Sequence, residues 1–104
     1  MKTLLRSCII VNRYNDKPDL FLRNVSDLRD SGLAFDTVED QALWTFVDDF
    51  TRDAGHVPEL ATVTLHFDRL KENSILERLR YIEAAPTATQ GDFKKRVEEK
   101  VADR

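Results

Sequence analysis

The chain has 104 residues, of which 41% are hydrophobic and 34% are charged, and it contains three glycines and three prolines. This length and composition are typical of one folded, helix-rich domain, and they exclude a disordered tail and a second domain. Sixteen Lys and Arg residues against nineteen Asp and Glu residues give a formal net charge of −3. The chain therefore lacks the overall basic field with which a protein binds DNA by charge alone.

The first third of the chain predicts two helices. The apolar residues of segment 4–11 allow a short helix, although the β-branched run at 9–11 would also suit a strand. A second helix is expected between Pro18, which fits a first turn because its missing N–H is not needed there, and Gly32, a natural C-terminal cap. Cys8 is the only cysteine, so it cannot form an internal disulfide and is expected to be a small buried hydrophobe.

The middle of the chain carries the clearest helix signals. Thr37 and Asp40 form a Ser/Thr-x-x-acid start, in which each side chain can accept a hydrogen bond from the other residue's backbone N–H. Gly55 is a natural C-cap, so this third helix is expected over residues 38–54. Between 59 and 70 the apolar pattern fits either a helix or a strand, and we expect a helix because no second convincing strand is present to pair with it.

Two further helices are predicted in the last third. The apolar residues between Ile75 and Ile82 indicate a fifth helix that stops near Pro86. Thr89 and Asp92 form another capping pair, which starts a sixth helix. The expected fold is all-α, a compact orthogonal bundle of about six helices.

The sixth helix carries one narrow apolar stripe, made by Phe93, Val97 and Val101 at four-residue steps. A stripe this narrow suits a seam between two helices, and no later helix follows to cover it. We predict that these three residues form a protein interface, and packing back on the fifth helix is the equally open alternative. Trp44 is a further candidate interface residue, because aromatic residues are enriched at interfaces, although a place in the core is the favoured interpretation.

The sequence carries no motif for catalysis or metal binding. It has no G-x-x-x-x-G-K-[ST] loop, so the chain cannot be a P-loop ATPase by itself. His56 and His66 have no cysteine companions and are expected to be a loop residue and a helix-surface residue. Asp48 and Asp49 are adjacent and point in different directions on a helix, so a solvated face is expected there. The basic run 94–96 is followed by acidic residues and is also read as a solvated face.

No apolar run approaches the roughly 20 residues that a membrane-spanning helix needs. The apolar patch near the N-terminus is interrupted by Arg6 and Ser7, and no small-residue cleavage site follows it. We therefore expect a cytoplasmic protein without membrane contact, which agrees with the use of a single cysteine.

The order of motifs from residue 35 onward carries a family resemblance. An aromatic residue closes a loop, a helix with an apolar-x-x-apolar body follows, and a short Gly-x-x-Pro passage leads into a Thr-Val helix start and a Leu-x-x-Leu helix. The most specific piece is a Pro-Thr-Ala segment before a helix with the pattern aromatic-x-x-x-Val-x-x-Lys. The residues concerned are Phe35, Leu43, Trp44, Phe46, Val47, Gly55, Pro58, Thr62, Val63, Leu76, Leu79, Pro86, Thr87, Ala88, Phe93, Val97, Glu99 and Lys100. This order resembles the N-terminal domain of DnaB-type replicative DNA helicases, in a divergent or phage-like form.

The resemblance covers residues 35–104 well and residues 1–34 poorly, and Phe93 stands where the family commonly has Tyr. It implies a helical head over residues 1–88 and, over 89–104, the first helix of a C-terminal hairpin that is truncated here. The motor domain of such a helicase would be absent from this chain. ATP and Mg are then expected only in that absent domain, and the chain itself is expected to have no cofactor and no enzymatic activity.

The role that the resemblance implies is assembly. Such domains form a collar above the motor ring, so we expect self-association as a dimer or hexamer, docking of primase or a helicase loader, and only indirect contact with DNA. Two alternatives stay open. One is a free-standing helical adaptor or loader-like protein of the replication machinery, and the other is a small helical nucleic-acid-binding regulator that uses the basic run 94–96 and Arg104.

Overall fold

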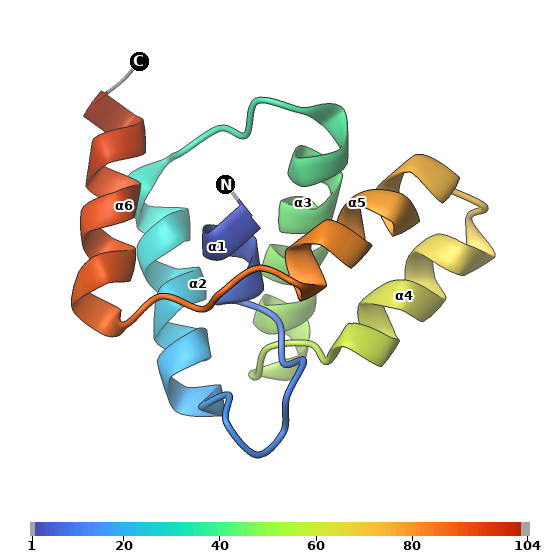
Figure 1. Cartoon of the computed structure of the whole chain (residues 1–104), viewed down its shortest axis with the longest axis horizontal. Coiled ribbons are helices and arrows are strands. Elements are labelled where there is room, and N and C mark those ends of the chain that lie inside the picture. The colour runs from blue at the N-terminus through green and yellow to red at the C-terminus, as the bar shows by residue number, and fades with distance from the viewer. Residues whose placement is uncertain (1, 103–104) are drawn as a thin grey trace.

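Six helices make up the fold, which is known from a computed structural model that describes residues 2–102 apart from the side chain of Gln90 (Figure 1). They are α1 (Lys2–Arg6), α2 (Pro18–Ser31), α3 (Val38–Ala54), α4 (Leu60–Arg69), α5 (Asn73–Glu83) and α6 (Gln90–Ala102). No strand occurs over this range, so the predicted all-α fold is confirmed. None of these helices combines the length and the apolar character that crossing a membrane requires.

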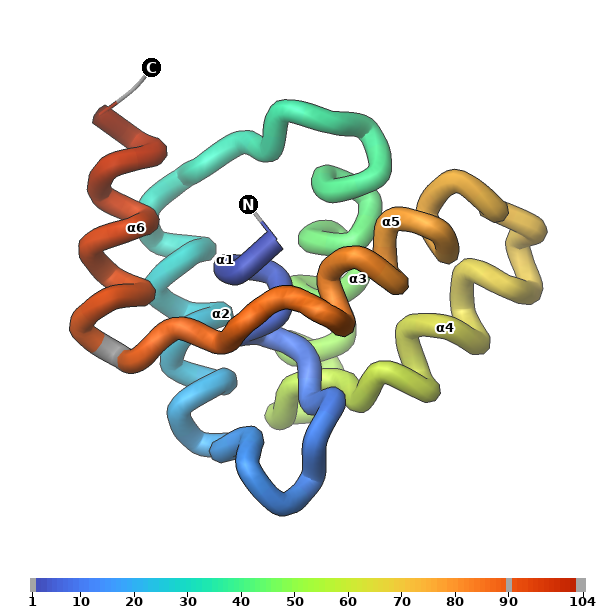
Figure 2. The backbone as a smooth tube through the Cα atoms, in the orientation of Figure 1, coloured from blue at the N-terminus to red at the C-terminus, as the bar shows by residue number. Residues whose placement is uncertain are grey.

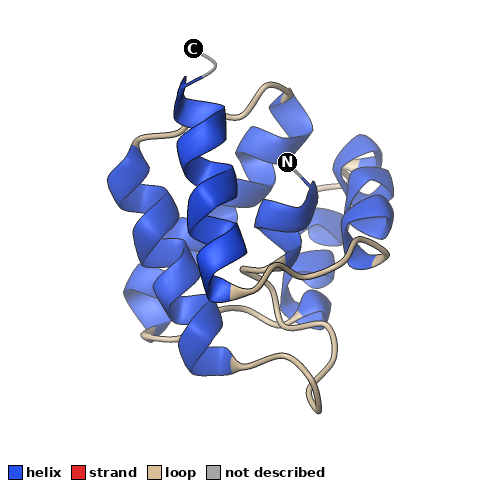
Figure 3. Cartoon of the chain, turned by 60° about the vertical axis from the view of Figure 1, so that its left-hand side comes forward, coloured by secondary structure: helices blue, strands red, loops and turns tan. Residues whose placement is uncertain are grey.

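Helix α3 occupies the middle of the bundle and packs against α1, α2, α4 and α5 (Figure 2). Helices α4 and α5 form a pair on one side of α3, joined by a short turn. Helix α2 lies on the other side, and α6 packs along α2 and against α1 (Figure 1, Figure 3). The last helix is therefore part of the same packed body as the first.

The capping residues that the sequence predicts lie at the helix ends. Gly32 and Gly55 follow α2 and α3 with φ of +66° and +78°, the left-handed conformation that glycine adopts without strain. At the start of α3, the hydroxyl of Thr37 accepts a hydrogen bond of 3.1 Å from the backbone N–H of Asp40. The predicted return bond from Asp40 is replaced, because its carboxylate accepts two bonds from Arg78 on α5.

The first helix is shorter than the apolar run that predicts it. Helix α1 ends at Arg6, and Ile10 is extended and forms an isolated parallel bridge with Glu59. The Ile10 N–H donates to the carbonyl of Pro58 at 3.0 Å, and the N–H of Leu60 donates to the Ile10 carbonyl at 2.9 Å. Within the β-branched run at 9–11, Ile10 thus pairs as in a strand, which is the alternative that the sequence allowed. Its partner lies far along the chain.

A buried ion pair fixes the loop between α1 and α2. Arg6 donates to both carboxylate oxygens of Asp16, at 3.0 and 3.3 Å, and Asp16 also accepts from the backbone N–H groups of Val11 and Asn12. Burial acts to raise the pKa of Asp16, but the hydrogen bonds from Asn12, Arg6 and Val11 outweigh it and hold that pKa below its ordinary value. These bonds attach the loop to the end of α1.

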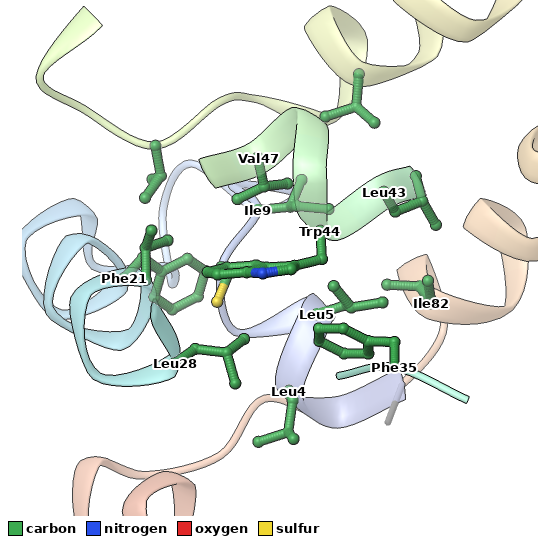
Figure 4. Close-up of a cluster of buried hydrophobic side chains, with 14 of the residues drawn as sticks. Leu4, Leu5, Ile9, Phe21, Leu28, Phe35, Leu43, Trp44, Val47 and Ile82 are labelled. Atoms are coloured by element: carbon green, nitrogen blue, oxygen red, sulfur yellow. The ribbon is translucent and has the colours of Figure 1, made fainter. Parts of the chain in front are cut away.

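The core is centred on the N-terminal segment and on the inner face of α3 (Figure 4). The Trp44 indole lies among Leu5, Phe21 and Leu28, and its ring centroid is 6.1 Å from that of Phe35. Trp44 is 7% exposed, so the favoured interpretation of this residue, a place in the core, is confirmed. Cys8 is fully buried as predicted, and burial raises the pKa of its thiol.

Ser7 joins three parts of the chain. Its hydroxyl donates to the Thr3 carbonyl at 2.8 Å and accepts from the backbone N–H of Ala88 at 3.0 Å, while its own carbonyl accepts from the side chain of Asn24 at 2.8 Å. The segment that leads into α6 is thereby attached to α1 and α2.

Candidate protein-docking groove

Helix α3 has two apolar stripes, of which only one is covered. The inner stripe, with Leu43 and Val47, is fully buried. Phe46 and Phe50 belong to the neighbouring outer stripe of the helix and are only half-buried. The neighbouring helices thus cover only part of the apolar surface of α3. Val38, at the start of the outer stripe, is 81% exposed.

The outer stripe forms one side of an open groove of about 860 Å³. Helix α4 forms the opposite side, and the loop before α3 closes one end. The residues that line the groove are Phe35, Asp36, Thr37, Val38, Gln41, Ala42, Thr45, Phe46, Asp49, Phe50, Asp53, His66 and Phe67. Eight of these positions belong to α3 between Val38 and Asp53, so the groove follows almost the whole length of this helix, about 22 Å at 1.5 Å per residue.

Aromatic rings in mutual contact make the apolar part of the groove. The His66 ring stacks on Phe46 with centroids 4.3 Å apart and planes 24° apart. Phe67 meets Phe46 edge-on at 5.7 Å, and Phe50 lies 6.0 Å from Phe46. These contacts hold the rings in place while part of their surface stays open. His66 is exposed on α4 and His56 follows α3 in a loop, as the sequence predicts for both.

The charged residues that line the groove are all acidic. Asp36, Asp49 and Asp53 contribute to its walls, and no Lys or Arg does so among the described residues. Asp49 is exposed, as expected for a solvated face. The same expectation is wrong for Asp48, which turns towards α2 and pairs with Arg29 at 2.6 Å and with Arg52 at 3.3 Å. The two adjacent carboxylates thus point in different directions, and only Asp49 reaches the groove.

The stripe predicted as an interface on α6 is covered by the chain itself. Phe93 is 0% and Val97 5% exposed, and Val101 is half-buried against the same core. Helix α6 packs on α2 and α1, and not on α5 as the alternative had it. Together with Trp44, these residues belong to the core and do not line the groove. Sequence spacing could not reveal this, because the helix that covers the stripe comes much earlier in the chain.

The remaining candidates form no site in the part of the chain that the structure describes. Lys94, Lys95 and Arg96 are exposed on α6, and Arg96 pairs with Asp92 at 2.9 Å, which agrees with a solvated face. Arg104 lies outside the described residues. Within residues 2–102, no three His, Cys, Asp or Glu side chains gather as metal ligands would.

No family model matches the sequence, and no curated protein or solved structure matches the chain. The function must therefore be argued from the groove and from the order of motifs in the sequence. Neither the groove nor its acidic lining was anticipated from the sequence. The sequence feature that could have indicated the groove is the number of large apolar residues on α3. With Val38, Phe46 and Phe50, the helix has more of them than one buried face can hold.

Proposed function

We propose that this chain is a protein-docking domain and that its groove binds a helix of a partner protein. The observation that carries the proposal is the open row of apolar side chains along the outer face of α3. Val38, Phe46 and Phe50 follow one another along the helix and stay wholly or partly exposed. Contiguous exposed apolar surface of this kind marks interaction sites on soluble proteins.

The shape of the groove favours a helical partner. It is open and follows one helix for about four turns, so a second helix of similar length can lie along it with its apolar stripe against Phe46 and Phe50. Phe46 is already held by His66 and Phe67. Binding therefore costs little side-chain ordering at the centre of the groove, which is where aromatic residues contribute most to affinity.

The motif order gives the proposal a more specific form. We propose that the chain is the N-terminal collar domain of a DnaB-type replicative DNA helicase, which self-associates and docks primase or a helicase loader. The support is the resemblance described above, together with defined places for its motifs. Gly55 caps α3, Pro58 precedes α4, and Ala88 in the Pro-Thr-Ala segment is hydrogen-bonded to Ser7 just before α6. ATP binding and unwinding would belong to another part of the parent protein.

Binding of groove variants to candidate partners tests this function. The partners are the primase and the helicase loader encoded in the same genome, immobilised for biolayer interferometry. Phe50→Ser and Val38→Ser are each expected to weaken binding about tenfold, because each removes an apolar anchor. Leu65→Ser, on an exposed part of α4 outside the groove, is the matched control and should have no effect. Val38 is 81% exposed, so its replacement does not disturb the core.

Each result has a separate meaning. Loss of binding in the groove variants alone supports the docking groove. Equal binding by all variants overturns the groove as the docking site. Failure of the wild-type chain to bind either partner overturns the replicative-helicase form of the proposal.

A further inference from the structure

We infer that the partner helix that fits this groove is basic, with Lys or Arg residues flanking its apolar stripe. This inference rests on the proposed function and specifies the chemistry of the partner. It follows from the three carboxylates that line the groove and from where they lie relative to the exposed rings.

The groove carries negative charge that the chain does not neutralise. Elsewhere on α3, two acidic residues are paired, since Asp40 binds Arg78 and Asp48 binds Arg29. Asp49 and Asp53 have no ion pair with any described residue, and Asp36 has none either. All three are exposed and line the groove. A partner that brings Lys or Arg to these positions gains attraction without breaking any existing pair.

The spacing of charge and apolar surface matches an amphipathic helix. Asp49 and Asp53 are four residues apart and so lie one above the other on α3, next to the stripe that contains Phe46 and Phe50. Asp36 lies at the other end of the groove, beside Val38. A partner helix of about four turns would thus place apolar residues on the rings and cations near both ends. A cation beside Phe50 also gains attraction from the face of the ring.

Two other occupants fit the groove less well. A nucleic-acid backbone would bring its phosphates close to three carboxylates, and repulsion would oppose binding. The exposed face of α6 from a second copy is basic in part, but it offers charged residues and no apolar stripe, because Phe93 and Val97 are buried. A basic amphipathic helix from a different protein satisfies both the charge and the apolar surface of the groove.

Three synthetic peptides provide the probes. Each is an amphipathic helix of about four turns with the same leucine stripe, and the flanking positions are all Lys, all Gln or all Glu. Affinity for the complete chain is measured by calorimetry at low and high salt, and the binding site is located from NMR amide shifts. We expect the Lys peptide to bind about tenfold more tightly than the Gln peptide and the Glu peptide to bind most weakly. High salt should reduce these differences.

Two charge-reversed double variants make the matched comparison. Asp49→Lys with Asp53→Lys reverses the charge of the groove, and Glu98→Lys with Glu99→Lys makes the same change in net charge on the exposed face of α6. The groove variant should prefer the Glu peptide over the Lys peptide. The α6 variant should keep the wild-type order, and circular dichroism should show both variants folded.

The outcomes separate the inference from the proposed function. A preference for the Lys peptide with shifts along α3 and α4, reversed only by the groove variant, supports both. Equal binding of the three peptides in the groove overturns the inference and leaves the docking function. The same change of order in the α6 variant also overturns it, because net charge would then explain the preference. Absence of groove shifts with every peptide at millimolar concentration overturns both.

Discussion

Arg78 on α5 donates two parallel hydrogen bonds to the carboxylate of Asp40 at the start of α3. The Arg78 Nε lies 2.6 Å from one carboxylate oxygen and a terminal guanidinium nitrogen lies 2.9 Å from the other. The side chain of Asp40 is 2% exposed and that of Arg78 is 26% exposed. The hydrogen bonds to Asp40 raise the pKa of Arg78 against the opposing effect of burial. The carboxylate also stands in the first turn of α3, where the helix dipole favours negative charge.

Replacing Arg78 should destabilise the fold strongly. We expect Arg78→Ala to lower the free energy of unfolding by about 3 kcal/mol, because it leaves a buried carboxylate without its partner. Arg52→Ala is the control, since Arg52 is 56% exposed in its pair with Asp48 and should cost less than about 0.5 kcal/mol. Urea unfolding followed by circular dichroism measures both. Similar losses for the two variants would show that the bond to Asp40 has no special weight.

Asp16 should make the free energy of unfolding of the domain depend on pH in the acidic range. Its pKa is lower in the folded chain than in the unfolded chain, where it is about 3.9. Its contribution is therefore fully present above the unfolded pKa and is lost as the pH falls through the folded pKa. We expect Asp16→Asn to be less stable than wild type near pH 7, and the difference between them to shrink below about pH 4.

Urea unfolding over a series of pH values measures this difference. Asp30→Asn, at an exposed position near the end of α2, is the control and should follow the wild-type pH dependence. A gap between Asp16→Asn and wild type that stays constant down to the lowest pH would contradict a lowered pKa at Asp16.

The hydroxyl of Ser7 should hold the entry to α6 in place. Ser7→Ala removes the acceptor of the buried Ala88 N–H, so we expect a loss of about 1 to 3 kcal/mol. In this variant, the rate of amide hydrogen exchange should increase more at Ala88 than at the amides of α4. Ser26→Ala, on the exposed side of α2, should change neither quantity. Unchanged exchange at Ala88 in Ser7→Ala would mean that other contacts hold this segment.

Val97 should act as a core residue. Val97→Asp places a charge at a position that is 5% exposed, so we expect the free energy of unfolding to fall by more than about 3 kcal/mol. Lys95→Asp, exposed on the same helix, should change it by less than about 1 kcal/mol. A fully folded Val97→Asp chain with reduced mass in light scattering would instead assign Val97 to an interface between copies.

Local signals predict the helices of this protein well. The bounds of α3 follow from Thr37 and Gly55, which act within one turn of the helix that they cap, and α2 follows in the same way from Pro18 and Gly32. The ambiguous stretch 59–70 is also a helix, α4, as expected. These elements could be read from the sequence because the deciding interactions lie between near neighbours.

Contacts between distant residues could not be predicted in this way. The loop of Asp16 depends on Arg6, and the extended residue Ile10 after α1 donates a hydrogen bond to Pro58. The stripe at Val97 is covered by α2, which precedes it by a long stretch of chain. The groove escaped prediction for the same reason, because the exposure of Phe46 is set by how little of α3 the helix α4 covers.

The hydrogen bond between Ser7 and Ala88 spans 81 positions of the chain. A ribosome therefore releases the central apolar residues of α1 long before it releases the segment that encloses them. Closing so long a loop is slow compared with forming individual helices. During synthesis, Leu4 and Leu5 stay incompletely covered until α6, one of the helices that pack against α1, has emerged.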